Sequence, residues 1–281
     1  MRVTRWMAHG ALVVLAVLCV APLLVMLLNA CKPLSEIQSG GLLQWPRHWT
    51  VQPWLRAWSS AQIGVSAQGL RPYFANSFLI VVPAVLLSTA VGALNGYALT
   101  QYRMRGAEFV YALLLFSVFI PFQIVLIPMA RLLGALGLSG TIAGLVFVNV
   151  VYGIGFVTLF FRNYYAHFPR DLVRSARMDG AGFFGVLLRI LLPNSGPIIV
   201  VTLIWQFTNI WNDFLFGSTF GDDATAPVTV ALNNLVNSSM GFKEYNVYFA
   251  AAIVAAVPTL VVYVASGRYF VRGLMAGAVK G

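Results

Sequence analysis

The residues of this chain that could do chemistry are few, and the charged ones gather in one place. Only 9% of the residues are charged, compared with about 25% in a soluble domain. Even so, five Arg and two Asp fall between Arg162 and Arg189. No nucleophile stands out beside a general base, so covalent catalysis is not indicated. Such a cluster is suited to binding something in the water beside a membrane.

Neither a metal site nor a nucleotide site is indicated by the sequence. The histidines His9, His48 and His167 are far apart, so no set of metal ligands is visible. The sequence has no Gly-x-x-x-x-Gly-Lys-Ser/Thr phosphate loop. We therefore expect a chain that is not an enzyme, that binds no cofactor, and whose energy for any work comes from another protein.

Composition indicates an integral membrane protein with several spans. Hydrophobic residues make up 59% of the chain, and the mean hydropathy is +0.82. The net charge is +10, but the Lys and Arg are scattered through short loops, as membrane topology requires. This distribution argues against nucleic acid as a partner and for the lipid bilayer.

Six segments are long and apolar enough to cross a bilayer, which takes about 20 residues. They lie at residues 9–30, 76–100, 108–130, 141–163, 196–217 and 247–269. Prolines inside them are tolerated where neighbouring helices satisfy the freed carbonyls. The expected fold is all-α, an integral membrane bundle of six transmembrane helices. We divide it into an N-terminal helix with an outer segment, residues 1–75, and a five-helix core, residues 76–281.

The charges in the loops predict the orientation of the chain. With the N-terminus inside, twelve Lys and Arg lie on the cytoplasmic side and six on the outer side. Because positive residues prefer the cytoplasm, we expect both termini there, with segment 164–190 in a cytoplasmic loop. Leu28-Asn29-Ala30-Cys31 could alternatively be a lipoprotein cleavage box, but the apolar run before it is longer than a signal core.

The cytoplasmic loop predicts a helix, a glycine turn and a second helix. Pro169 suits the first turn of a helix, and Asp171 suits its positive end. Gly180 breaks this helix, and an apolar stretch follows it. The first helix would have an apolar face made of Leu172, Val173, Ala176 and Arg177. Two interpretations remain open: an amphipathic surface segment, or a docking element for a cytoplasmic partner.

The loop resembles that of bacterial ABC importer permeases, whose consensus is Glu-Ala-Ala, two residues, Asp-Gly-Ala and a later Leu-Pro. Asp179-Gly180-Ala181 and Leu192-Pro193 match, whereas Arg174-Ser175-Ala176 replace Glu-Ala-Ala. Further motifs follow in the family's order: Asn76-Ser77, Gly96-Tyr97-Ala98-Leu99, Ile120-Pro121-Phe122-Gln123, Phe161-Arg162-Asn163, Trp211-Asn212-Asp213-Phe214 and the tail 273–281. The resemblance is to the shorter, maltose-type carbohydrate permeases and covers almost the whole chain.

The resemblance implies a type I ABC importer of five parts in the inner membrane. Beside this permease it implies a second permease subunit in a heterodimer, two cytoplasmic ATPase subunits that use ATP and Mg, and a periplasmic sugar-binding protein. The loop would insert into an ATPase subunit and pass on its motion. The coupling residues would be Arg174, Ser175, Ala176, Met178, Asp179, Gly180, Ala181 and, in the tail, Lys280. Without the Glu, docking should rely on Asp179, Gly180 and the apolar face.

Polar residues of the fifth and third spans are candidates for a translocation path. Asp213 is the only acid well inside an expected span, and the amides of Asn209 and Asn212 suit sugar hydroxyls. Gln206 lies one turn deeper, beside Trp205, which we interpret as packing. Gln123 lies where Pro121 should break the third span. The alternative role for these groups is hydrogen bonding between helices that fixes the bundle.

The substrate rests on resemblance alone. Segments 54–58, 69–74 and 227–235 look most like glucose- or mannose-type permeases, so we expect a monosaccharide, with a disaccharide or sugar alcohol as alternatives. The polar outer segment 218–246 is either a solvated loop or, as in maltose-type relatives, a loop that enters the binding protein. An ion-coupled secondary transporter, which would show mid-span charges and inverted repeats, and a membrane-anchored sensor are the rival classes.

Overall fold

The computed structural model describes residues 2–102, 105–237 and 243–278, and most of these are helical. In this part of the chain there is no β-strand, only an isolated bridge between Ile63 and Ser66. The all-α prediction is confirmed here. Helices are expected in lipid because they satisfy their backbone N–H and C=O groups internally.

The chain forms two compact units, Met1–Ala75 with Val228–Val257, and Asn76–Pro227 with Pro258–Gly281. The first contains α1 (Arg2–Ala30), α2 (Leu34–Gly40), α3 (Gln52–Ser59), α12 (Val228–Asn237) and the first part of α13 (Tyr245–Ala278). The second contains the rest of α13, most of α4 (Arg71–Gln101), and α5 (Ala107–Phe119), α6 (Phe122–Ala135), α7 (Ile142–Ala166), α8 (Arg170–Met178), α9 (Phe183–Val186), α10 (Gly196–Trp211) and α11 (Leu215–Phe220). Residues 228–257 thus group with the N-terminal part of the chain.

Among the described residues, four helices are long and apolar enough to span a membrane, and the number rises to six if each of two bent helix pairs is one span. The four are His9–Ala30, Arg71–Gln101, Ile142–Ala166 and Tyr245–Gly267. They agree with the expected first, second, fourth and sixth spans. The multi-pass character predicted from composition is therefore present in the fold.

The first bent pair has the break that Pro121 predicted for the third span, whereas the second corrects the expected fifth span. Between α5 and α6 the chain turns by 103° at Ile120 and Pro121, because proline lacks an N–H and holds the residue before it in an extended conformation. Segment Phe183–Asn194 meets α10 at 81°. The fifth helix ends at Trp211, so the expectation of one helix over residues 196–217 was wrong.

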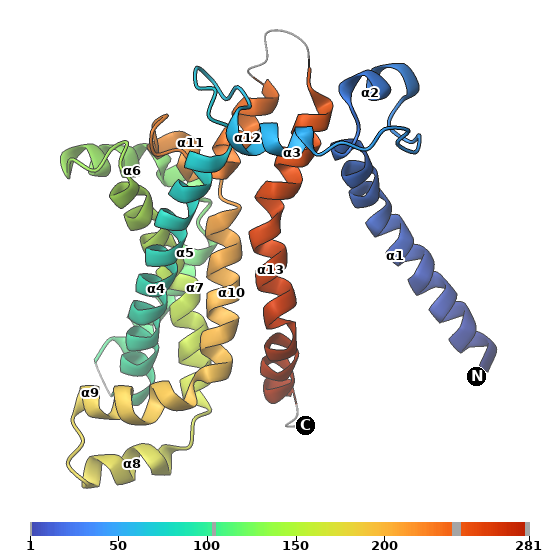
Figure 1. Ribbon diagram of the computed structural model, residues 1–281. Helices are drawn as coiled ribbons and strands as arrows, with labels where there is room; N and C mark the ends of the chain where they lie inside the picture. The colour runs from blue at the N-terminus through green and yellow to red at the C-terminus, as the bar shows by residue number, and fades with distance from the viewer. Residues whose placement is uncertain (1, 103–104, 238–242, 279–281) are drawn as a thin grey trace. The chain divides into compact units, whose positions relative to one another are not determined.

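Helix α7 lies at the centre of the second unit and is approached closely by α4. A Cβ added to Gly92 would lie 2.3 Å from Val157 Cγ1, and one added to Gly96 would lie 2.7 Å from the Arg162 nitrogen. Two glycines four residues apart form the small-xxx-small pattern that lets membrane helices touch. Figure 1 shows α4, α7 and α10 running side by side. These glycines therefore set the spacing of α4 and α7.

A buried hydrogen bond joins α4 to α10 across α7. Gln206 is 3% exposed, and its Nε2 donates to Ser88 Oγ at 2.8 Å. On α7, Gly153 leaves room for this amide, because a Cβ there would lie 2.0 Å from Gln206 Nε2. Three helices are thus fixed at one level by a single polar contact.

Candidate functional site

Loop 164–190, which we expect on the cytoplasmic side, has the predicted shape of a helix, a glycine turn and a helix. Pro169 precedes α8, and Asp171 lies in its first turn. Gly180 has a φ of +84°, a left-handed conformation that glycine adopts without steric cost. The turn brings the Ala181 N–H within 2.9 Å of the Ala176 carbonyl oxygen. Beyond it, α9 continues into a π-helical turn, Leu187–Leu191.

The inner face of the loop packs on the ends of α4 and α7. Val173 and Ala176 are 2% and 9% exposed and belong to a buried cluster with Tyr97, Phe161 and other residues of the two spans. In Figure 1, α8 and α9 lie together at the same end of the bundle. Buried apolar contact makes the loop move with these helices rather than independently.

The predicted apolar face of α8 was too wide. Of the predicted apolar residues, Val173 and Ala176 pack into the buried cluster. Leu172 does not reach this cluster and is 52% exposed. Arg177 is exposed, and its guanidinium donates to the Gln101 carbonyl oxygen at 3.2 Å. It also lies 4.9 Å over the Tyr102 ring. This clamp between α8 and the end of α4 was not identified from the sequence.

The remaining coupling candidates divide by exposure. Arg174, Ser175, Met178, Asp179 and Gly180 are exposed, Ala181 is half-buried and Ala176 is buried. Arg174 forms an ion pair with Asp171 at 3.5 Å, with both side chains largely exposed, and such pairs contribute little to stability. Lys280 lies outside the described residues. The structure thus brings seven of the eight candidates together on one loop.

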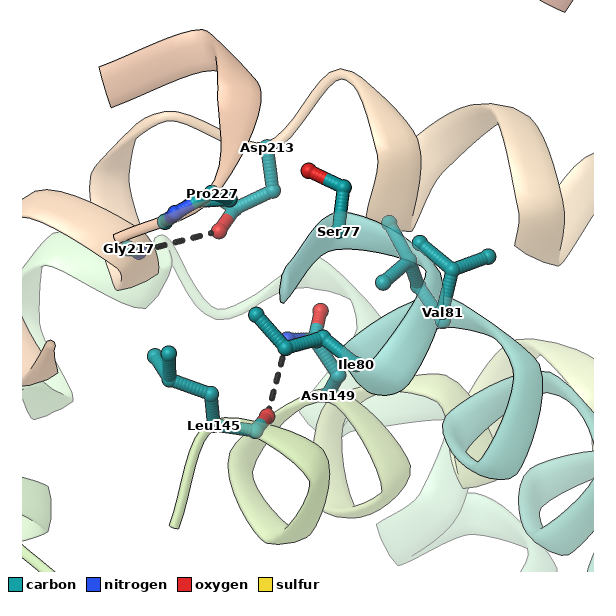
Figure 2. Close-up of a pocket in the computed structure, with 9 residues that line it drawn as sticks. Ser77, Ile80, Val81, Leu145, Asn149, Asp213, Gly217 and Pro227 are labelled. Atoms are coloured by element: carbon teal, nitrogen blue, oxygen red, sulfur yellow. Dashed lines mark hydrogen bonds between the residues drawn. The ribbon is translucent and has the colours of Figure 1, made fainter. Parts of the chain in front are cut away.

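Asp213 lies beyond the end of its helix, which corrects the expectation that it is inside the fifth span. It follows the end of α10, and its carboxylate oxygens accept hydrogen bonds from the Phe216 and Gly217 N–H groups at 3.2 and 3.3 Å. Figure 2 shows it at a small cavity with Ser77 and Asn149. The cavity holds about 10 Å³, which is at most one water molecule. In this conformation a sugar does not fit there.

The other path candidates have different surroundings. Gln206 is engaged with Ser88, as described above, so it fixes the bundle. Asn209 and Asn212 are exposed, and their amides donate to the Trp205 and Thr208 carbonyl oxygens of their own helix at 2.8 Å. Gln123 is exposed in the first turn of α6. Of the five path candidates, Asn209, Asn212 and Gln123 are therefore the ones with exposed side chains.

Trp205 belongs to the same exposed stripe of α10. Residues 205, 209 and 212 are spaced by four and three, so they share one helix face. Trp205 is 41% exposed, and its ring also contacts Phe156 and Phe160, with centroids 5.7 and 6.1 Å apart. The packing interpretation is therefore only part of its role, since one edge of the ring stays open.

The described part of segment 218–246, which we expect on the outer side, contains a helix. Residues 228–237 form α12, which buries Val228, Val230, Ala231 and Leu235. Before it, the Asp222 carboxylate accepts hydrogen bonds from the Thr225 hydroxyl and N–H at 2.9 Å. These bonds hold the pKa of Asp222 below its ordinary value, against a small opposing effect of burial. Asn233 and Asn237 remain exposed on α12.

Comparison with known proteins gives the family. The family described as the inner membrane component of binding-protein-dependent transport systems matches residues 84–275. A probable ABC transporter permease of Pyrococcus horikoshii is 42% identical over 181 residues, 64% of this chain and 65% of that relative. The xylose/arabinose import permease of Haloferax volcanii is 36% identical over 72% of each chain.

A solved structure has the same fold. A chain of a bacterial ABC transporter involved in the import of the acidic polysaccharide alginate superposes with a TM-score of 0.82, over 96% of this chain and 97% of that chain, at 18% identity. The fold of this chain is therefore shared with a chain of a solved ABC transporter. The chain is a member of the inner-membrane components of binding-protein-dependent transport systems, and it is a permease of the ABC sugar-import class.

Proposed function

We propose that loop 164–190 docks onto a cytoplasmic ATPase subunit and carries its movement into the helices around the transport path. The observation that carries this proposal is the two-sided character of the loop. Its inner side is buried with α4 and α7. The loop also carries four large apolar side chains that are not buried. Leu172, Met178, Phe184 and Leu188 have exposed fractions of 52, 81, 64 and 57%.

The exposed side fits a protein partner better than water. Apolar side chains gathered on a charged loop are typical of interaction surfaces. The exposed turn at Asp179 and Gly180 lies between Met178 and Phe184 along the chain, so a partner can enclose it. Because Arg174 stands in place of the family's Glu, we assign the contact to the apolar residues and the turn.

We assign the remaining parts of the assembly by the family. A second permease subunit completes the path in a heterodimer, two ATPase subunits bind ATP and Mg and hydrolyse the nucleotide, and a periplasmic protein delivers the substrate. Both chain termini lie in the cytoplasm, as the distribution of Lys and Arg favours. The loop then faces the ATPase side, which is the orientation that coupling needs.

The exposed stripe of α10 is our candidate for contact with the substrate. Trp205 offers a ring edge, and Asn209 and Asn212 offer amides, which suit the apolar faces and hydroxyls of a sugar. Asp213 and Gln206 are assigned to fixing the bundle instead, since their polar groups are engaged within the chain. Gln123 stays a candidate because it is exposed beside the bend.

The substrate is a carbohydrate, and we favour an oligosaccharide over glucose or mannose. Similar permeases are named for the uptake of diacetylchitobiose, arabinooligosaccharides and α-glucosides, and none of those names is a hexose. Binding assays of the partner binding protein against hexoses, disaccharides and longer oligosaccharides distinguish these possibilities. Tight binding of a free hexose alone would overturn the preference.

Substitution of the turn tests the coupling role. Gly180→Asp places a side chain at a φ of +84°, whereas Gly182→Asp adds the same charge at a φ of −72°, which any residue adopts. Neither added Cβ meets another atom within 4 Å. We expect Gly180→Asp to reach the membrane but to lose sugar uptake while ATP hydrolysis continues, and Gly182→Asp to lose less. Undiminished uptake by Gly180→Asp in vesicles would refute docking through this turn.

Copurification tests the assembly. An ABC permease should bring an ATPase subunit and a second permease with it when it is purified from the membrane. Recovery of a lone homodimer that takes up sugar with protons would instead establish the ion-coupled alternative.

A further inference from the structure

A buried lysine beside the end of α1 has too few partners for its charge. Lys32 is 1% exposed, and its Nζ donates to Asn29 Oδ1 at 3.2 Å. Among the described residues, this is its one hydrogen-bond acceptor, and no carboxylate lies within 4.0 Å. An ammonium group has three N–H donors. Burying it with one neutral acceptor is costly unless an anion completes the site.

The lysine lines a polar cavity within the first unit. The cavity holds about 220 Å³ and is lined by Lys32, Glu36, Ser39, Gln44, Trp45 and Arg47 as well as Gly40. This volume admits a small polar group but not an oligosaccharide. Hydroxyl, amide and cationic donors surround it, which is the set that recognises a phosphate.

The one acid of the cavity is already engaged. The Glu36 carboxylate accepts from the N–H groups of Arg47 and His48 at 3.0 and 2.9 Å, and it lies 2.7 Å from His48 Nδ1. Desolvation acts to raise its pKa, but these hydrogen bonds outweigh it and hold the pKa below the ordinary value. Glu36 therefore stays a carboxylate, and the two cations leave the cavity with one net positive charge. A phosphodiester, with one negative charge, balances it.

The cavity lies at the edge of a lipid-facing helix. The most apolar stretch of the span His9–Ala30 has a mean hydropathy of 3.1, and none of that stretch is buried against the rest of the chain. Lys32 follows it by two residues, and Figure 1 shows α2 at the end of α1 away from the N-terminus. Leu43, Trp45 and Trp49 beside the cavity are 85, 70 and 58% exposed. Exposed tryptophans next to a span are typical of the headgroup layer.

We propose that this cavity binds the phosphate of an anionic phospholipid, with Lys32 and Arg47 as the cations and Ser39 and Gln44 as further donors. Basic pockets beside membrane helices bind lipid headgroups in this way. The exposed leucine and tryptophan side chains would lie against the acyl chains. The site is separate from the coupling loop and the α10 stripe, so it does not depend on their assignment.

The test measures lipid retention by the full chain. The purified protein is mixed with phosphatidylglycerol and phosphatidylcholine, and bound lipid is counted by native mass spectrometry. Lys32→Met removes the charge but keeps the length, Arg47→Gln changes an exposed cation, and Lys243→Met is the control, since Lys243 is exposed in the same unit. We expect phosphatidylglycerol affinity to fall about tenfold in each cavity variant, as for loss of a charged hydrogen bond, and to stay unchanged in the control.

A second arm distinguishes the lipid from a free phosphate. Glycerophosphoglycerol, a soluble phosphodiester with the same single negative charge, is added in place of the lipid, and its binding is measured for the wild-type chain and both cavity variants. Weak binding beside strong lipid retention supports the lipid headgroup, and equal affinities, lost in both variants, assign the phosphate site to a soluble ligand. Retention of phosphatidylglycerol by Lys32→Met and Arg47→Gln at the level of Lys243→Met would overturn the proposal.

Discussion

Replacing Gly96 by alanine should separate α4 from α7. The new Cβ would lie 2.7 Å from the Arg162 backbone nitrogen and from Phe161 Cβ, and 2.9 Å from the Phe161 carbonyl carbon. Ordinary Cβ contacts lie at 3.4–4 Å. Two of the three obstacles are backbone atoms, so no side-chain rotation relieves the clash and the helices must move apart by roughly 1 Å, as in overpacked cores.

The expected loss follows from two opposing contributions. Overpacking of this kind costs about 1–3 kcal/mol, and alanine recovers at most about 1 kcal/mol through its better helix propensity. Taking the middle of the first range, about 2 kcal/mol, leaves a net loss of about 1 kcal/mol in the free energy of unfolding, or a fall of roughly 2–4 °C in Tm. The Asn95 Nδ2 to Thr158 Oγ1 hydrogen bond between the same helices, 3.3 Å long, should lengthen as well.

Thermal unfolding of the detergent-solubilised chain measures this loss. Gly10→Ala is the matched control, because Gly10 is also helical but a Cβ there meets nothing within 4 Å. We expect its Tm to stay level or rise. If Gly96→Ala unfolds at the same temperature as Gly10→Ala or higher, then Gly96 does not set the spacing of the two helices.

The remaining predictions concern three polar contacts. Gln206→Ala should lower the free energy of unfolding by about 1–3 kcal/mol, because Ser88 loses a buried partner; an unchanged Tm would contradict the bridging role. Arg177→Met should reduce sugar uptake per ATP hydrolysed by about tenfold through loss of a charged hydrogen bond, with Arg177→Lys in between, and equal ratios in all three proteins would count against the clamp. Asn209→Ala should reduce sugar uptake without lowering Tm, since its amide donates to a carbonyl oxygen of its own helix. The control is Asn163→Ala, which removes an exposed amide on α7. An equal loss of sugar uptake in the control would remove the case for the α10 stripe.

The loop and the spans could be predicted because their signals are local. Pro169 and Gly180 begin and end α8 through their own backbone preferences. Pro121 likewise marks the break between α5 and α6. The end of α10 has a quieter signal, because Trp211-Asn212-Asp213 contains neither proline nor glycine. Asp213 accepts hydrogen bonds from N–H groups three and four residues on, at the start of the next short helix. This contact is also local, since Asp and Asn favour helix N-termini, but it was not used to place the end of the span.

The contacts that the sequence did not show join residues far apart in the chain. Gly92 and Gly96 form a recognisable small-xxx-small pattern, but their partners on α7 are about 65 residues away. Arg177 and Gln101 are separated by 76 residues, and Gln206 and Ser88 by 118. A single sequence gives residue types and local spacing, and it does not pair distant helices.

The sharp bend at Pro121 has a consequence for the surrounding lipid. Helix α5 contains 13 residues, which extend about 20 Å at 1.5 Å per residue, while the hydrocarbon layer is about 30 Å thick. Helix α6 turns away by 103°, so it adds little to the height. The bilayer beside α5 is therefore expected to be locally compressed, a hydrophobic mismatch that brings the headgroup layer and its water toward Gln123.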